Sequence, residues 1–226
     1  MNAFEERSIT TVVFDLDGVL IDSFEVMRTA FARAYHEVVD DGEPPFEEYL
    51  RYQGRWFADI MRAMDLPLEM EGPFVRASAE LVDLVQVYPG VPEVLRWLHA
   101  NGVRTAVATG KAASRARHVL RAKGLLPLLD TVVGSDEVRH PKPEPDIVRE
   151  ALRRIDASAD DAVMIGDAAI DLQSGRAAGT ATVAALWGPG EAAELALEHP
   201  DAMLAAPADL LTLVPAVAGE DPRRSA

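Results

Sequence analysis

The sequence contains no cysteine, which excludes disulfide bonds, thiol catalysis and cysteine metal sites. Histidine is also sparse, and the five histidines are scattered without metal-ligand spacing: His36, His99, His118, His140 and His199. Any metal ion would therefore need oxygen ligands. Such ligands suit a hard cation such as Mg²⁺.

Basic side chains are few relative to acidic ones. Lysine and arginine number 22 against 37 aspartates and glutamates, which gives a formal net charge of −15. This charge would repel a nucleic-acid backbone or an anionic membrane surface, so we expect neither as a partner. The sequence also lacks an apolar stretch of about 18 residues, and residues 1–11 lack the pattern of a secretory signal. These absences predict a cytoplasmic protein.

Apolar residues make up 49% of the chain, enough to bury a full core. Short β-branched runs predict buried strands at 11–14, 103–108, 131–133, 162–165 and 181–187. Segments with helical spacing lie between most of these runs, among them 113–123, 145–154 and 168–178. This alternation predicts an α/β fold with a Rossmann-like, doubly wound parallel sheet that is covered by helices on both faces.

One region breaks the alternation, because residues 23 to about 86 contain helical patterns and no strand candidate. The first pattern has apolar side chains at Phe24, Met27, Phe31, Tyr35 and Val38. Later patterns cover 57–64 and 74–85. We therefore expect a small helical insert after the first strand, with hinges at 18–23 and at the Pro- and Gly-containing segment 87–92.

The chain is thus expected to divide into a core, an insert and a tail. The predicted boundaries are 1–18 and 90–216 for the α/β core, 19–89 for the helical insert and 217–226 for a disordered tail. Apolar side chains of the insert could form a dimer face, although monomers also expose such groups. We expect a monomer or a weak homodimer.

Acidic residues follow two of the predicted strands. Asp15 and Asp17 end the first strand, while Asp167 ends the fourth and Asp171 comes four residues later. Ligands of open α/β sheets gather at the carboxyl ends of the strands, where these side chains would converge. Carboxylates placed together are costly unless a cation or a proton holds them. A magnesium ion and one lysine would balance this set.

Such carboxylates suit the hydrolysis of a phosphate monoester. A carboxylate nucleophile divides the displacement into two in-line steps, and a second carboxyl group protonates the leaving oxygen and later deprotonates water. Asp15 and Asp17 fit these two roles. The Thr109 hydroxyl, the backbone N–H groups near Gly110 and the Lys142 ammonium could bind the phosphoryl oxygens.

Two further features could help to bind phosphate. Gly18 and Gly110 would allow the backbone to approach it closely. Lys111 fits either of two interpretations, a steering charge for phosphate or a solvated side chain.

Each of these residues also has a simpler explanation. Asp15 and Asp17 could form an ordinary strand-end turn, and Thr109 could cap the next helix. Lys142 could be an exposed loop lysine, and Asp171 a first-turn acid favoured by a helix dipole.

Four motifs, FDLDGVLIDS, ATGK, HPKPEPD and IGDAAIDLQSGRAAG, together resemble those of the haloacid dehalogenase superfamily and span the chain. The resemblance implies a Mg²⁺-dependent phosphatase of small phosphorylated metabolites, with an aspartyl-phosphate on Asp15. For catalysis it implies Asp15, Asp17, Thr109 and Lys142. For the metal it implies Asp15, the Asp17 carbonyl and Asp167, with Asp171 nearby. The insert would be a helical C1-type cap that closes over the substrate.

Residues 41–76 of the insert resemble the cap of phosphatases found with 3-amino-5-hydroxybenzoate synthesis genes in ansamycin-type antibiotic pathways. This narrower resemblance implies a sugar or aminosugar phosphate as substrate. Gln53 and Arg55 fall where related caps carry a specificity loop. The Arg55 guanidinium could bind hydroxyls or a carboxylate of the leaving group, or Arg55 could be a solvated arginine at a helix end.

Other functions remain open. The chain could be a general phosphatase of the phosphoglycolate type, a phosphoacceptor domain or a binding protein without turnover. Within the superfamily, Asp17 argues against a dehalogenase, and Met27 stands where sugar phosphomutases carry a histidine. The absence of lysine from 23–86 argues against phosphonate hydrolysis.

Overall fold

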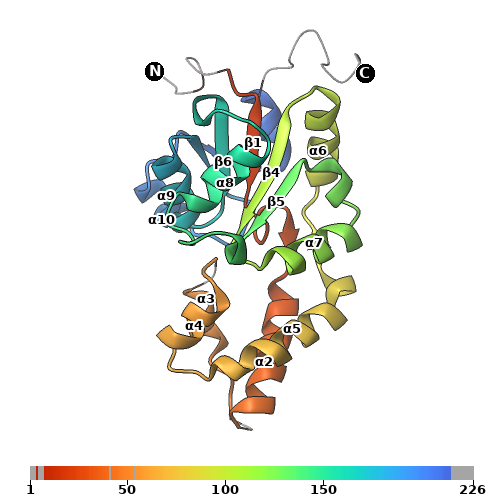
Figure 1. Ribbon diagram of the computed structural model, residues 1–226, viewed down its shortest axis with the longest axis vertical. Coiled ribbons are helices and arrows are strands. Elements are labelled where there is room, and N and C mark those ends of the chain that lie inside the picture. Colours follow the sequence, from red (N-terminus) through yellow and green to blue (C-terminus); the bar gives the residue numbers. More distant parts are fainter. Residues whose placement is uncertain (1–3, 5–7, 41, 53, 215–226) are drawn as a thin grey trace.

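A six-stranded parallel sheet forms the centre of the molecule, with the strand order β5-β4-β1-β6-β7-β8 (Figure 1). The structure is a computed structural model that describes residues 4, 8–40, 42–52 and 54–214. The strands are β1 (Thr11–Phe14), β4 (Arg104–Thr109), β5 (Thr131–Gly134), β6 (Ala162–Gly166), β7 (Ala181–Ala185) and β8 (Ala202–Leu204). The predicted doubly wound α/β fold is confirmed.

Helices cover both faces of the sheet. Helices α6 (Val91–Ala100) and α7 (Ala113–Ala122) lie over one face, and α8 (Asp146–Arg154) and α9 (Ala169–Ala178) over the other, with α10 (Ala192–Leu197) beyond α9. Side chains alternate along a strand, so Val12 and Phe14 pack with α6 and α7, whereas Val13 packs with α8. Double-sided burial requires continuous apolar strands.

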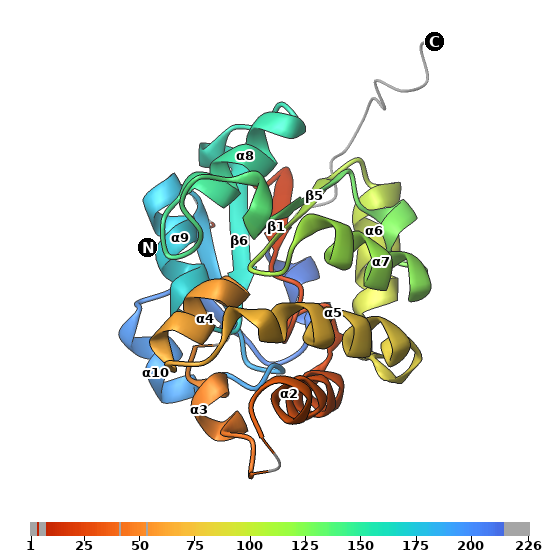
Figure 2. The same ribbon diagram turned by 60° about the horizontal axis from the view of Figure 1, so that its bottom comes forward.

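A separate group of helices lies beyond the carboxyl ends of the strands (Figures 1 and 2). These helices are α2 (Phe24–Val38), α3 (Phe46–Leu50), α4 (Phe57–Ala63) and α5 (Glu71–Glu80). We call them, with their connections, the cap. The cap has its own hydrophobic cluster. In it the ring centres of Phe31 and Tyr49 are 4.8 Å apart, and those of Phe57 and Phe74 are 4.7 Å apart.

A short antiparallel ribbon joins the cap to the core. Strand β2 (Ile21–Asp22) pairs with β3 (Gln86–Val87), so the two connections lie side by side. The sequence did not predict this ribbon, because two-residue strands are too short to show alternation. It also missed β8, which follows α10 and pairs with β7.

Two other details differ from the prediction. The run predicted at 181–187 leaves the sheet after Ala185, and the Trp187 indole N–H donates to the Val19 carbonyl at 3.0 Å. The pattern predicted at 74–85 divides into α5 and a 3₁₀ turn at Val82–Leu84. The predicted tail, 217–226, lies outside the described residues. None of the described helices combines the length and the apolar character that crossing a membrane requires.

Replacing Phe31 by alanine should destabilise the protein by about 3–5 kcal/mol, because its ring is fully buried in the cap cluster and the cavity cannot fully collapse. Urea unfolding followed by circular dichroism measures this loss. Arg28→Ala on the same helix is the control, since the exposed Arg28–Glu25 pair should contribute less than about 1 kcal/mol. Equal losses for the two variants would contradict the assigned packing.

Candidate active site

Asp15 directly follows β1, and its side chain is buried at the carboxyl edge of the sheet. The Lys142 ammonium donates to Asp15 Oδ1 at 2.7 Å and to Asp171 Oδ1 at 2.5 Å. Burial raises the pKa of Asp15 to about 7, although the Lys142 charge opposes this shift. The Lys142 ammonium is itself fully buried, but the two carboxylates more than offset burial and raise its pKa. This lysine therefore bridges two carboxylates as a cation.

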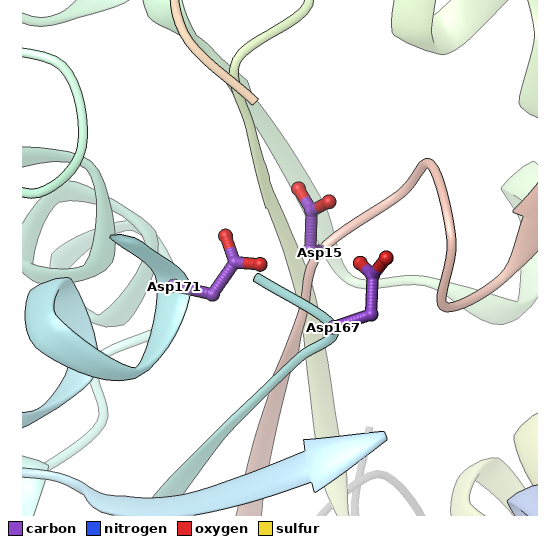
Figure 3. A group of neighbouring side chains, drawn as sticks. All are labelled: Asp15, Asp167 and Asp171. Atoms are coloured by element: carbon purple, nitrogen blue, oxygen red, sulfur yellow. The ribbon is translucent and has the colours of Figure 1, made fainter. Parts of the chain in front are cut away.

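Three carboxylates from two strand ends and a helix gather around one space. Oxygens of Asp15, Asp167 and Asp171 lie within 4.8 Å of one another, and all three side chains are buried (Figure 3). Burial, followed by repulsion from Asp171 and Asp15, raises the pKa of Asp167 well above its ordinary value. Lys142 balances one of the three charges, so the donor set fits a divalent cation with oxygen ligands.

Asp171 has two roles in its surroundings. It lies in the first turn of α9, where Asp171 Oδ2 accepts the Ala168 backbone N–H at 3.1 Å. Its other oxygen accepts from Lys142. Asp171 is thus a helix-capping acid that also belongs to the carboxylate group.

The Asp17 carboxylate is held by a different set of contacts. Asp17 Oδ1 accepts from the Lys111 ammonium at 2.9 Å and from the Ser23 hydroxyl at 2.5 Å. Burial alone would raise the pKa of Asp17, but Lys111 and the Ser23 hydrogen bond outweigh it and lower the pKa. The side chain is not part of the three-carboxylate group among the described residues, and Lys111 is an ion-pair partner, not a freely solvated lysine.

The predicted phosphate-binding residues lie at the same edge of the sheet. Thr109 ends β4, is buried, and its Oγ1 accepts the Lys111 backbone N–H at 3.2 Å. Gly18 has a positive φ of 88°, and a Cβ there would lie 2.1 Å from Asp167 Oδ2. Gly110 faces the cap, since a Cβ there would lie 2.1 Å from the Gly54 carbonyl oxygen. Both positions require glycine for close approach.

A cavity of about 410 Å³ opens between this edge and the cap. Its lining includes Asp15, Asp17, Thr109, Lys111 and Asp167 from the core. The predicted specificity residue Arg55 also lines it, with an exposed guanidinium 5.4 Å from the Tyr52 ring centre. Gln53 lies outside the described residues.

The sequence analysis missed several residues of the cavity and site, among them Ser23, Tyr49 and Arg115. Ser23 binds Asp17, while Tyr49 of the cap and Arg115 of α7 line the cavity. A signal existed for Arg115, because it follows Thr109 by six positions and lies in the first turn of the next helix, near the strand ends. His140 does not line the cavity and instead pairs with Asp146 on the surface at 3.0 Å.

Comparison with known proteins places this site in a family. Residues 12–185 match the haloacid dehalogenase-like hydrolases, a span of more than half the chain. The chain belongs to this family. The predicted membership and the predicted hydrolase class are both confirmed.

This haloacid dehalogenase-like hydrolase aligns with individual relatives over most of their length. It is 33% identical over 214 residues to the pyrophosphatase PpaX of Bacillus pumilus, covering 92% of this chain and 98% of that protein. It is 33% identical over 190 residues to the probable phosphatase IndB of Dickeya dadantii, and this match covers 78% of this chain and 81% of that protein. The solved structure of a haloacid dehalogenase-like hydrolase from Streptococcus pneumoniae matches with a TM-score of 0.75 at 25% sequence identity. The match covers 91% of this chain and 98% of the Streptococcus pneumoniae chain.

Mg²⁺ should stabilise the hydrolase, because a bound ion would relieve the repulsion among Asp15, Asp167 and Asp171. At about 100 times Kd the midpoint of thermal unfolding should rise by about 5–10 °C relative to the protein in EDTA. Asp167→Asn should lose this rise, whereas Asp160→Asn, an exposed acid near the start of β6, should keep it. An equal rise in both variants would contradict a metal site at this carboxylate group.

Proposed function

We propose that this hydrolase is a phosphatase of small phosphorylated metabolites and that it forms an aspartyl-phosphate on Asp15. The observation that carries the proposal is the position of the Asp15 carboxylate. It is buried at the cavity wall, with the Lys142 ammonium at 2.7 Å and Thr109 and Lys111 lining the same cavity. A carboxylate beside donors for phosphoryl oxygens is arranged for in-line attack on phosphorus.

The reaction would proceed in two displacements. A carboxylate oxygen of Asp15 attacks phosphorus and the bond to the leaving oxygen breaks. Asp17, which is an ion-paired carboxylate in this structure, would first take up a proton from the phosphate monoanion of the substrate and then donate it to that oxygen. Water then attacks phosphorus, Asp17 accepts a proton from the water, and the bond between phosphorus and Asp15 breaks to release inorganic phosphate. Asp17 lines the cavity as this role requires.

The phosphoryl group would be held by charge and hydrogen bonds from the core. Lys142, Lys111 and the Thr109 hydroxyl can donate to its oxygens. Asp15, Asp167 and the Asp17 carbonyl would hold Mg²⁺, with Asp171 beside them. When bound, the ion neutralises charge on the phosphoryl oxygens.

Cap closure would keep bulk water from the reacting atoms. The Gly54 carbonyl lies against Gly110, and a Cβ at Gly54 would come within 2.8 Å of the Ile170 side chain. The cap loop is therefore close to the loop after β4 and to the first turn of α9. Exclusion of water strengthens each electrostatic interaction inside the cavity.

The substrate class rests on the comparisons and on the cap sequence. The name of the Bacillus pumilus relative indicates that pyrophosphate is cleaved by a similar protein. The resemblance of residues 41–76 to aminobenzoate-pathway phosphatases adds sugar and aminosugar phosphates, with a role in antibiotic precursor synthesis. A phosphoglycolate-type substrate is the alternative. We place the activity in the cytoplasm.

Phosphate release from pyrophosphate, phosphoglycolate, sugar phosphates and aminosugar phosphates, each with and without Mg²⁺, tests the proposal. We expect turnover that requires Mg²⁺ and falls by at least about 10³-fold in Asp15→Asn, because an amide is not a nucleophile here. Asp146→Asn, an acid outside the cavity, should keep wild-type rates. Metal-independent turnover, or an active Asp15→Asn, would contradict the mechanism.

Asp17→Asn separates the two displacements. With p-nitrophenyl phosphate the leaving group needs no proton, so the first step should proceed while water attack lacks its base. We expect a burst of p-nitrophenolate near one equivalent of enzyme, followed by slow turnover. Slow release without a burst would be evidence against a covalent intermediate.

Gly110→Ala should lower kcat/KM by about 10²-fold, because its Cβ would push the cap loop away from the site. The midpoint of thermal unfolding should change little. Gly72→Ala in α5 is the control, since a Cβ there meets only the Arg76 side chain at 3.5 Å. Full activity of Gly110→Ala would show that this contact is not needed for turnover.

A further inference from the structure

Arg115 is a cationic side chain of the cavity wall that forms no ion pair with any acid in the described part of the chain. It extends from α7 of the core, and its guanidinium carbon lies 5.0 Å from the ring centre of Phe74 in the cap. The side chain is half-buried and forms neither a hydrogen bond nor an ion pair with a described residue. Asp17 and Glu71 are close enough to act on its charge, but Asp17 is already bound by Lys111 and Glu71 is exposed.

This lack of a partner is unusual in so acidic a chain. With a net charge of −15, most arginines in the described ranges bind an acid or a carbonyl oxygen. The described arginines that form no such contact are Arg51, Arg55, Arg115, Arg121 and Arg139. Three of these five, Arg51, Arg55 and Arg115, line the cavity. Positive charge is thus left unpaired where a substrate would lie.

The surroundings of Arg115 favour an anion over a neutral group. Its neighbours in the cavity wall include Phe74 and Tyr49. Most of the Tyr49 side chain is buried, and its hydroxyl forms no hydrogen bond with a described residue. Burial lowers the pKa of Arg115, which reflects the cost of removing water from its charge. Paired hydrogen bonds to a carboxylate or phosphate offset that cost most fully, because two oxygens of such a group match two N–H groups of the planar guanidinium.

We propose that Arg115 and Tyr49 form a binding subsite for a second anionic group, a carboxylate or a further phosphate, on the leaving group of the substrate. The inference rests on the proposed phosphatase function and narrows its substrate class. A sugar phosphate has an uncharged leaving group, which would leave Arg115 unpaired, and the ammonium of an aminosugar phosphate would be repelled by Arg115. Because Arg115 belongs to the core and Tyr49 to the cap, the subsite is complete only when the cap is closed.

The acids of the cavity do not oppose this assignment. Glu191 and Glu194 line the cavity near α10, which lies on the other side of the strand ends from α7 in both views (Figures 1 and 2). Both side chains are exposed, so solvent screens their charge. The acids at the strand ends face the phosphoryl group, which leaves the opposite end of the substrate for Arg115.

Pairs of substrates that differ in charge test the subsite. One pair is phosphoglycolate and 2-hydroxyethyl phosphate, which differ by a carboxylate; the other is pyrophosphate and methyl phosphate, which differ by a phosphate. In each pair, the charged member is the one whose leaving group is anionic, and the neutral member is the one whose leaving group is uncharged. Arg115→Gln should lower kcat/KM for the charged member by about 10- to 100-fold and that for the neutral member by less than about threefold. Arg121→Gln, an exposed and unpaired arginine on the same helix, is the matched control and should change neither.

Tyr49→Phe provides a second variant that removes only the hydroxyl. It should lower kcat/KM selectively for charged members, by about three- to tenfold. Selective loss with phosphoglycolate alone would assign the subsite to a carboxylate, and with pyrophosphate alone to a phosphate. Equal losses for charged and neutral members would overturn the proposal, because Arg115 would then only hold the cap against the core through Phe74. Turnover of the substrates without this selectivity overturns the inference alone, whereas no Mg²⁺-dependent turnover of any substrate overturns the proposed function too.

Discussion

The site depends on one buried ammonium group. Lys142 lies between the carboxylates of Asp15 and Asp171, with its side chain wholly removed from solvent. Without this cation, three buried carboxylates would repel one another and would be protonated in preference to being charged. Lys142 keeps the carboxylate of Asp15 beside a positive charge. The remaining negative charge is the reason that the site suits a divalent cation.

The cavity carries opposite charges on its two sides, and the fold separates them. Carboxylates come from the ends of β1 and β6, which lie next to each other in the centre of the sheet. The cap side presents aromatic rings and unpaired arginines instead. A substrate with one phosphoryl group and a second anion would be oriented by this polarity. In this structure the cap meets the core at both ends of the cavity, since the Gly54 carbonyl lies against Gly110 and the Phe74 ring lies beside Arg115.

Much of the site could be predicted because parallel strands impose a rule on the sequence. A strand buried on both faces must be apolar, so a carboxylate that ends it is conspicuous, and all such ends meet at one edge. Asp15, Thr109 and Asp167 were found in this way, and the structure brings them to one cavity. The partners of Asp17 could not be found by this rule. Lys111 and Ser23 approach it from separate loops, and their contacts depend on side-chain directions.

The sequence by itself determined the sheet, the helical insert and the carboxylates of the site, because periodicity and strand ends are local properties of the chain. Only the tertiary structure decided which charges are paired. Lys142 reaches Asp15 across 127 positions of sequence, whereas Arg115 forms no ion pair with an acid in the described part of the chain. Whether a charged side chain finds a partner depends on distances of a few ångströms between elements far apart in the chain, and composition and spacing do not contain those distances.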